Sequence, residues 1–251
     1  MFSLSTKFSP ASANFEKAIF AGYENAELYM TPTRLMSWKS LSKIARSFDL
    51  NYVLHFPTEG KIGSQTCEEI VRLARDLGCQ IIVVHEEQLD DVSLISSLDP
   101  GIRLAVENQY LHFNDLDEWI ASHEFVTLDI EHLWKNTLHD CDLNSLCSVV
   151  RSLLKKHNCR IQHIHLPGYL PGQAEQKPMY CSREMVFSMF DILYEEQYGG
   201  WVVGELDENF QNQHEMKMDL LLFETWKSKV SSLPLLNSVM TQPPFSAAEP
   251  S

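Results

Sequence analysis

Four short apolar runs in this chain each end in a residue that can bind a metal ion or transfer a proton. The four end residues are Glu107, Asp129, His165 and Glu205. Parallel strands end at the same edge of a sheet, so these side chains are expected to meet. Three carboxylates placed together need a cation, because like charges raise one another's pKa. Three oxygen donors and one imidazole suit one divalent ion, with Mn²⁺, Mg²⁺ and Zn²⁺ as candidates.

Segments of strand and helix character alternate along the chain and must position these residues. Eight such strands alternate with eight helices over a length typical of one domain, which favours a single-domain (β/α)8 TIM barrel. A doubly wound open sheet remains the alternative. No Gly-x-Gly-x-x-Gly follows any strand, so a dinucleotide site has no support. The expected strands are 2–6, 26–29, 51–56, 80–85, 102–107, 125–129, 160–165 and 201–205.

Several helix ends carry recognisable signals. Thr33 is a plausible cap for one helix, and Thr66 with Glu69 matches a capping box. Gly78 is expected to end the helix that follows Thr66, and Asp142 can cap a later one.

The strand ends predict inward-facing side chains. Alternate residues of a strand face the same side, so Glu107 shares its face with Ala105, and Glu205 shares its face with Val203. Ala105 and Val203 are small enough to line a barrel interior. His163 is expected as an interior histidine below the site.

Composition limits the classes of partner. The chain has 251 residues and a net charge of −14, with no basic run, so binding to nucleic acid is not expected. No signal peptide or membrane-length apolar run is present, which predicts a cytoplasmic protein. The six cysteines include no Cys-x-x-Cys pair, and free thiols are expected. The predicted barrel covers residues 1–232, and residues 233–251 form a tail expected to be disordered.

Further polar residues follow other strands in a recognisable order. Taken together, they resemble the xylose isomerase-like barrel superfamily, which includes sugar isomerases, ketose 3-epimerases, inosose dehydratases and the endonuclease IV enzymes. The Asp-x-x-His after the sixth strand is the most specific piece. The matching stretches are Ala26-Glu27-Leu28, His55, His85, Glu107-Asn108, Asp129-Ile130-Glu131-His132, His165-Leu166 and Glu205.

The resemblance to the epimerase branch implies specific roles. Glu107, Asp129, His165 and Glu205 would bind one divalent metal, and His132 would contact the substrate. Glu107 and Glu205 would act as the acid/base pair on opposite faces of the substrate carbon. The implied reaction removes a proton next to a carbonyl and proceeds through an enediolate. The expected partner is a small-molecule sugar or sugar phosphate, and further copies of the chain in a homo-oligomer.

Four more residues are candidates for substrate contact. His55 and His85 end strands, and they are expected to touch the substrate or support the ligands. Trp134 and Tyr169 lie on predicted loops over the barrel mouth, where either ring can stack on a sugar. Packing within the loops is the alternative role for both rings.

The chain also departs from two branches of this superfamily. Endonuclease IV relatives carry an Asp-x-His pair after the seventh strand, but residues 172–178 contain none. Ketose 3-epimerases place an Arg shortly after the strand-seven His, and residues 166–171 contain none. A metal-dependent isomerase or epimerase is therefore the leading prediction. The rivals are an endonuclease IV-like phosphodiesterase, which needs additional metals at His55 and His85, and a non-catalytic relative.

Overall fold

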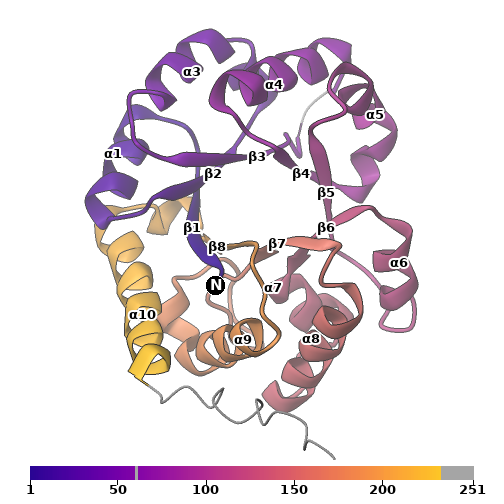
Figure 1. Ribbon diagram of the computed structural model, residues 1–251, viewed down its shortest axis with the longest axis vertical. Helices are drawn as coiled ribbons and strands as arrows, with labels where there is room; N and C mark the ends of the chain where they lie inside the picture. The colour runs from indigo at the N-terminus through magenta and orange to yellow at the C-terminus, as the bar shows by residue number, and fades with distance from the viewer. Residues whose placement is uncertain (60–61, 233–251) are drawn as a thin grey trace, which may run out of the picture.

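The computed structural model describes residues 1–59 and 62–232, and its strands form one closed parallel barrel surrounded by helices (Figure 1). The predicted (β/α)8 barrel is therefore confirmed, and the open-sheet alternative is excluded. The predicted tail, residues 233–251, lies outside the described residues. The strands are β1 (Ser3–Phe8), β2 (Asn25–Tyr29), β3 (Asn51–His55), β4 (Ile81–His85), β5 (Arg103–Glu107), β6 (Phe125–Asp129), β7 (Ile161–His165) and β8 (Trp201–Glu205).

Helices cover the outside of the barrel between successive strands, as Figure 1 shows. The α-helices are α1 (Ser12–Ala21), α2 (Pro32–Leu35), α3 (Trp38–Ala45), α4 (Ser64–Leu77), α5 (Leu89–Leu98), α6 (Leu116–Ser122), α7 (Ile130–His132), α8 (Leu143–His157), α9 (Arg183–Glu195) and α10 (Gln213–Ser232). Short helical turns are η1 (Glu86–Gln88), η2 (Leu133–Thr137), η3 (Met179–Ser182) and η4 (Glu208–Phe210). None of these described helices is both long and apolar enough to cross a membrane.

The strand register brings the polar strand ends to one level. Each strand pairs in parallel with its sequence neighbour, and β8 closes the barrel on β1. His85 lies opposite Glu107 in the β4–β5 pair, and Asp129 lies opposite His165 in the β6–β7 pair. The residue just before each of these strand ends points away from the barrel interior and faces the helices. Leu128, for example, is fully buried in the apolar core between barrel and helices.

Two predicted helix starts are wrong, and two predicted caps are confirmed. The helix expected after Thr33 is divided into α2 and α3, and Thr31 caps α2 by accepting a hydrogen bond from the backbone of Arg34. Helix α4 begins at Ser64, so Thr66 lies inside the helix rather than at its cap. Gly78 ends α4 with φ +71°, and Asp142 caps α8.

Candidate active site

At the C-terminal end of the barrel, the carboxylates of three predicted metal ligands surround one nitrogen of the fourth, His165. His165 Nδ1 lies 3.3 Å from Glu205 Oε2. The same nitrogen lies 3.5 Å from Glu107 Oε1 and 3.6 Å from Asp129 Oδ2. Donor atoms bound at about 2.0–2.2 Å to one ion lie roughly 3.0–3.6 Å from one another. Glu107, Asp129 and His165 form one of the groups that could hold a metal ion, with their ligand atoms all within 4.8 Å of one another, and Glu205 Oε2 lies beside His165 Nδ1.

Glu27 determines which nitrogen of His165 faces these carboxylates. His165 Nε2 lies 3.1 Å from Glu27 Oε2 and donates to it, because a carboxylate can only accept. This leaves His165 Nδ1 facing the ligand cluster, buried and without a hydrogen-bond partner among the described residues. His163 Nε2 also lies 3.1 Å from Glu27 Oε2, which places His163 beneath the site as expected.

The cluster attracts positive charge. Burial alone would lower the pKa of His165, but Glu27, Glu107 and Glu205 raise that pKa well above its ordinary value. Burial alone would raise the pKa of Glu27, but His165, Lys7 and His163 hold it well below its usual range. A metal ion would supply such a charge at the same place.

Glu107 is surrounded by histidines. Its Oε2 lies 3.1 Å from His55 Nε2 and 3.5 Å from His85 Nε2. Its Oε1 lies 3.5 Å from His132 Nδ1. Burial would raise the pKa of Glu107, but the charge of His165 holds it well below its usual range.

Glu107 also belongs to two groups of residues that can hold a metal. One is Glu107 with Asp129 and His165, and the other is Glu107 with His55 and His85. The sequence predicted a single ion and placed His55 and His85 around it. The structure brings both histidines to Glu107.

His132 extends the cluster toward the solvent. Its backbone N–H donates to Asp129 Oδ1 at 2.7 Å, so Asp-x-x-His forms the start of α7. Its Nδ1 lies 3.0 Å from the carbonyl oxygen of Asn108 and donates to it. Burial lowers the pKa of His132, but Asp129 and Glu107 raise it to about 9.

Lys7 and Gln176 hold the outward oxygen of Glu205. Lys7 Nζ donates to Glu205 Oε1 at 2.5 Å, and Gln176 Nε2 donates to the same oxygen at 3.0 Å. Lys7 Nζ also lies 3.4 Å from Glu27 Oε1. Burial would lower the pKa of Lys7, but Glu205, Glu27 and Glu107 raise it above its ordinary value.

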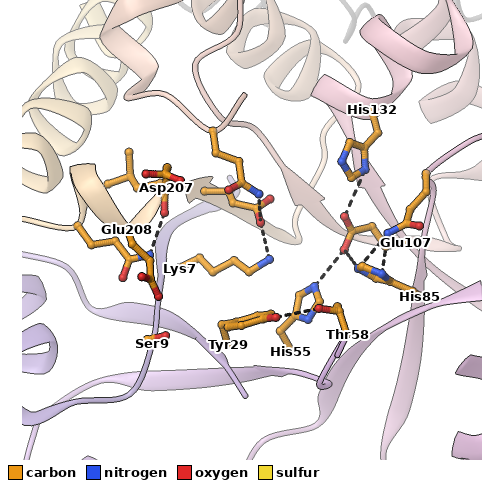
Figure 2. A pocket seen from close by; sticks show the side chains of 15 residues that line it. Lys7, Ser9, Tyr29, His55, Thr58, His85, Glu107, His132, Asp207 and Glu208 are labelled. Carbon is orange, nitrogen blue, oxygen red and sulfur yellow. Dashed lines mark hydrogen bonds and ion pairs between the residues drawn. The ribbon is translucent and has the colours of Figure 1, made fainter. Parts of the chain in front are cut away.

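A cavity of about 320 Å³ opens above these groups (Figure 2). It is large enough for a small polar molecule. Asp129 and His165 lie beneath its floor and do not line it. The cavity is lined by Lys7, Ser9, Tyr29, His55, Thr58, His85, Glu107, Gln109, His132, Gln176, Glu205, Leu206, Asp207, Glu208 and Gln211.

The loop between β7 and α9 contributes Gln176 to the lining of the cavity. Gly168 and Lys177 pair across this loop and close it. Gln176 adopts a left-handed backbone with φ +53°. Its N–H donates to Glu131 Oε2 at 2.9 Å, and its carbonyl oxygen accepts from the N–H of Asp207 at 2.9 Å. These contacts direct the Gln176 side chain toward Glu205.

No protein-family model and no curated protein sequence matches the chain. Solved structures match it over most of its length. A D-tagatose 3-epimerase-like protein is 16% identical with a TM-score of 0.62, covering 92% of this chain and 98% of that one. Endonuclease IV from Thermus thermophilus is 17% identical with a TM-score of 0.56, covering 90% and 99%. D-allulose 3-epimerase from Methylomonas sp. is 13% identical with a TM-score of 0.59, covering 89% and 97%.

This protein shares the barrel fold of these enzymes. The resemblance to xylose isomerase-like barrels that the sequence predicts is therefore confirmed at the level of the fold. The similar structures include both sugar epimerases and endonuclease IV, so the fold alone does not choose between the two chemistries.

Of the two roles that the sequence left open for Trp134, the structure favours packing within the loops over contact with a substrate. Its side chain is 4% exposed and does not line the cavity. Its Nε1 donates to the carbonyl oxygen of Cys141 at 2.7 Å, and its ring packs edge-on against Tyr169. The turn η2 rotates the indole into the protein, so the ring packs within the loops and does not face a substrate.

Lys7, Gln109 and Gln176 line the cavity, and the sequence prediction missed all three. The expected first strand ended at residue 6, one residue before Lys7. Its serines and threonine gave a weak strand signal. A lysine two residues after the inward-facing Ser5 was the available clue.

Proposed function

We propose that the protein is a divalent-metal-dependent isomerase or epimerase of sugars or sugar phosphates, which moves a proton on the carbon beside a carbonyl through an enediolate. One observation carries this proposal. Three carboxylate oxygens lie within 3.6 Å of the unpartnered Nδ1 of His165, beneath a polar cavity.

The donor set fits a divalent metal. Glu107, Asp129, His165 and Glu205 would hold the ion, and they combine three hard oxygen donors with one imidazole. Glu27 fixes the orientation of His165, as a hydrogen-bonded carboxylate does for many metal-binding histidines. When bound, such an ion stabilises negative charge on the substrate's oxygen atoms.

Two glutamates are placed to move the proton. Glu107 and Glu205 line the cavity from β5 and β8, which β6 and β7 separate in the closed barrel. One carboxylate removes the proton next to the carbonyl. Return by the other carboxylate from the opposite face gives epimerisation, whereas transfer to the adjacent carbon gives isomerisation. His132 contacts the substrate from the cavity wall, and His55 and His85 position Glu107.

The proposal is tested by solvent exchange. Metal-loaded protein is incubated in D₂O with a panel of ketopentoses, ketohexoses and their phosphates, and deuterium next to the carbonyl is followed by NMR. At least one substrate is expected to take up deuterium, and Glu205→Gln is expected to abolish the uptake. The exposed Glu118→Gln on α6 is the matched control. No exchange with any member of the panel would refute the proposal.

One observation favours a second candidate, an endonuclease IV-like phosphodiesterase. His55 Nδ1 lies 2.9 Å from the carbonyl oxygen of Phe56 and must donate to it. In a neutral ring, Nε2 then presents a lone pair to Glu107 Oε2 only 3.1 Å away, and burial lowers the pKa of His55. A second cation between His55, His85 and Glu107 would relieve this contact.

The second candidate makes distinct predictions. It requires more than one bound metal per chain and cleavage of duplex DNA at an abasic position. The net charge of −14 and the lack of an Asp-x-His pair in residues 172–178 favour the sugar enzyme. A non-catalytic relative would bind no metal, and Glu107→Gln and Glu205→Gln would not impair its function.

A further inference from the structure

Lys7 is the single lysine or arginine among the described residues that line the cavity. It lies near the end of β1, directly opposite Glu205 in the β1–β8 pair. Its side chain extends across the cavity wall toward the centre of the site, as Figure 2 shows. The predicted metal site does not require it, because the four strand-end ligands belong to β5, β6, β7 and β8.

The contacts of Lys7 leave at least one N–H of its ammonium available to a molecule bound in the cavity. A lysine ammonium has three donors. One donates to Glu205 Oε1 at 2.5 Å, and Glu27 Oε1 is the next carboxylate oxygen, at 3.4 Å. The ammonium lies 5.7 Å from the centre of the Tyr29 ring, which lines the same cavity. An oxygen atom of a bound molecule can therefore accept the remaining hydrogen bond.

We propose that Lys7 is a further catalytic residue, whose ammonium donates a hydrogen bond to an oxygen of a polyhydroxylated substrate beside Glu205 and stabilises negative charge that develops there. This inference rests on the proposed sugar chemistry of the same cavity. A donor already in place, in a site partly shielded from water, stabilises such charge strongly because it needs no reorganisation.

The surrounding groups define the kind of oxygen to which Lys7 can donate a hydrogen bond. Gln176 Nε2 and the hydroxyl groups of Tyr29 and Thr58 provide further polar contacts on the cavity wall. Asp207 and Glu208 line the cavity as well, and their carboxylates repel a phosphate dianion. The hydroxyl or carbonyl oxygen of an uncharged sugar suits this wall best.

The alternative is a purely structural role, in which Lys7 only neutralises Glu205 and Glu27. A buried pair of carboxylates without a cation is destabilising. If Lys7 had only this role, Lys7→Met would lower the stability of the protein but leave ligand binding unchanged. The two roles differ in what the folded variant does with a ligand, and a binding measurement separates them.

The test compares wild type, Lys7→Met and the control Lys177→Met, each loaded with Mn²⁺. Lys177 lies on the β7–α9 loop, and its Nζ donates to Gln173. Calorimetry measures the affinity of xylitol and of sorbitol, which are polyols that cannot react. Lys7→Met is expected to bind them at least tenfold more weakly while retaining the metal, and Lys177→Met is expected to bind them as wild type does. Where a ketose exchanges deuterium, kcat of Lys7→Met is expected to fall about 100-fold and KM to rise about tenfold, in line with the weaker polyol binding.

These measurements test the role of Lys7 and the proposed reaction independently of each other. Polyol binding that depends on Lys7, without deuterium exchange by wild type, would refute the reaction and retain Lys7 as a ligand-binding residue. Equal affinities of wild type and Lys7→Met, or no polyol binding by wild type, would overturn the assignment. If Lys7→Met does not fold, a structure of wild type with xylitol decides. A polyol oxygen within about 3.2 Å of Nζ supports the assignment, and the absence of any within about 4 Å overturns it.

Discussion

His165 Nε2 and Glu27 Oε2 lie 3.1 Å apart in the barrel interior, and this contact fixes the chemistry of the opposite nitrogen. Because Nε2 donates to Glu27, Nδ1 faces Glu107, Asp129 and Glu205. The same carboxylate also contacts His163 beneath the site. Glu27 therefore connects the packed interior of the barrel to the proposed metal site.

Removing the charge of Glu27 is expected to weaken metal binding. Glu27→Gln retains the volume of the side chain but holds the orientation of His165 less strongly, so metal affinity should fall about 10- to 100-fold. The measurement is a metal titration followed by calorimetry, after circular dichroism has shown that the variant is folded. The exposed neighbour Glu24 provides the control Glu24→Gln. Unchanged affinity in Glu27→Gln would contradict this role.

Gln176 allows its side chain to be tested apart from its backbone. Glycine adopts a φ of +53° without strain, so Gln176→Gly preserves the backbone contacts to Glu131 and Asp207. It removes only the amide that donates to Glu205. Deuterium exchange is expected to slow about tenfold, because a hydrogen bond to a charged group contributes roughly 1.5–3 kcal/mol.

The melting temperature of Gln176→Gly should stay close to that of wild type. Gln173→Ala on the same loop serves as the control. Exchange at the wild-type rate in Gln176→Gly would show that the amide has no part in the reaction.

A buried carboxyl group predicts how stability depends on pH. Asp219 on α10 is buried, and burial raises its pKa well above the ordinary value, although backbone N–H groups of Met179 and Tyr180 oppose the shift. The native state then holds a proton that the unfolded chain releases above about pH 4. The resulting stabilisation is complete below that pH and is lost as pH rises toward the native pKa. Its slope is roughly 1.4 kcal/mol per pH unit.

The variant Asp219→Asn lacks this titration. Urea unfolding of the metal-free protein at pH 5, 7 and 9 should therefore show Asp219→Asn gaining stability over wild type as pH rises. A stability difference that is constant with pH would mean that Asp219 titrates normally.

The sequence predicted the barrel and the convergence of four polar strand ends, because both depend on local patterns. Apolar runs such as 201–204 mark buried parallel strands, and a polar residue such as Glu205 at the end of each run stands out. Gln176 could not be predicted this way. Its position depends on contacts with Glu131 of α7 and with Asp207, which follows β8.

Lys7 was missed, and the role of Trp134 was left open, for related reasons. The first strand has few aliphatic residues, so its end was predicted too early. The direction of the Trp134 ring depends on how η2 winds and on the carbonyl group of Cys141, to which its Nε1 donates. Neither feature has a signature in the local sequence.

The central claim, a divalent ion held by four strand ends, is tested most directly by metal analysis of the purified protein. Wild type loaded with Mn²⁺, Mg²⁺ or Zn²⁺ and then freed of excess metal is compared with Glu107→Gln and Glu205→Gln, with Glu118→Gln as the control. One ion per chain is expected in wild type and in Glu118→Gln, and less than one in the other two variants. The absence of bound metal under every loading condition, or full metal content in both site variants, would contradict the proposed site.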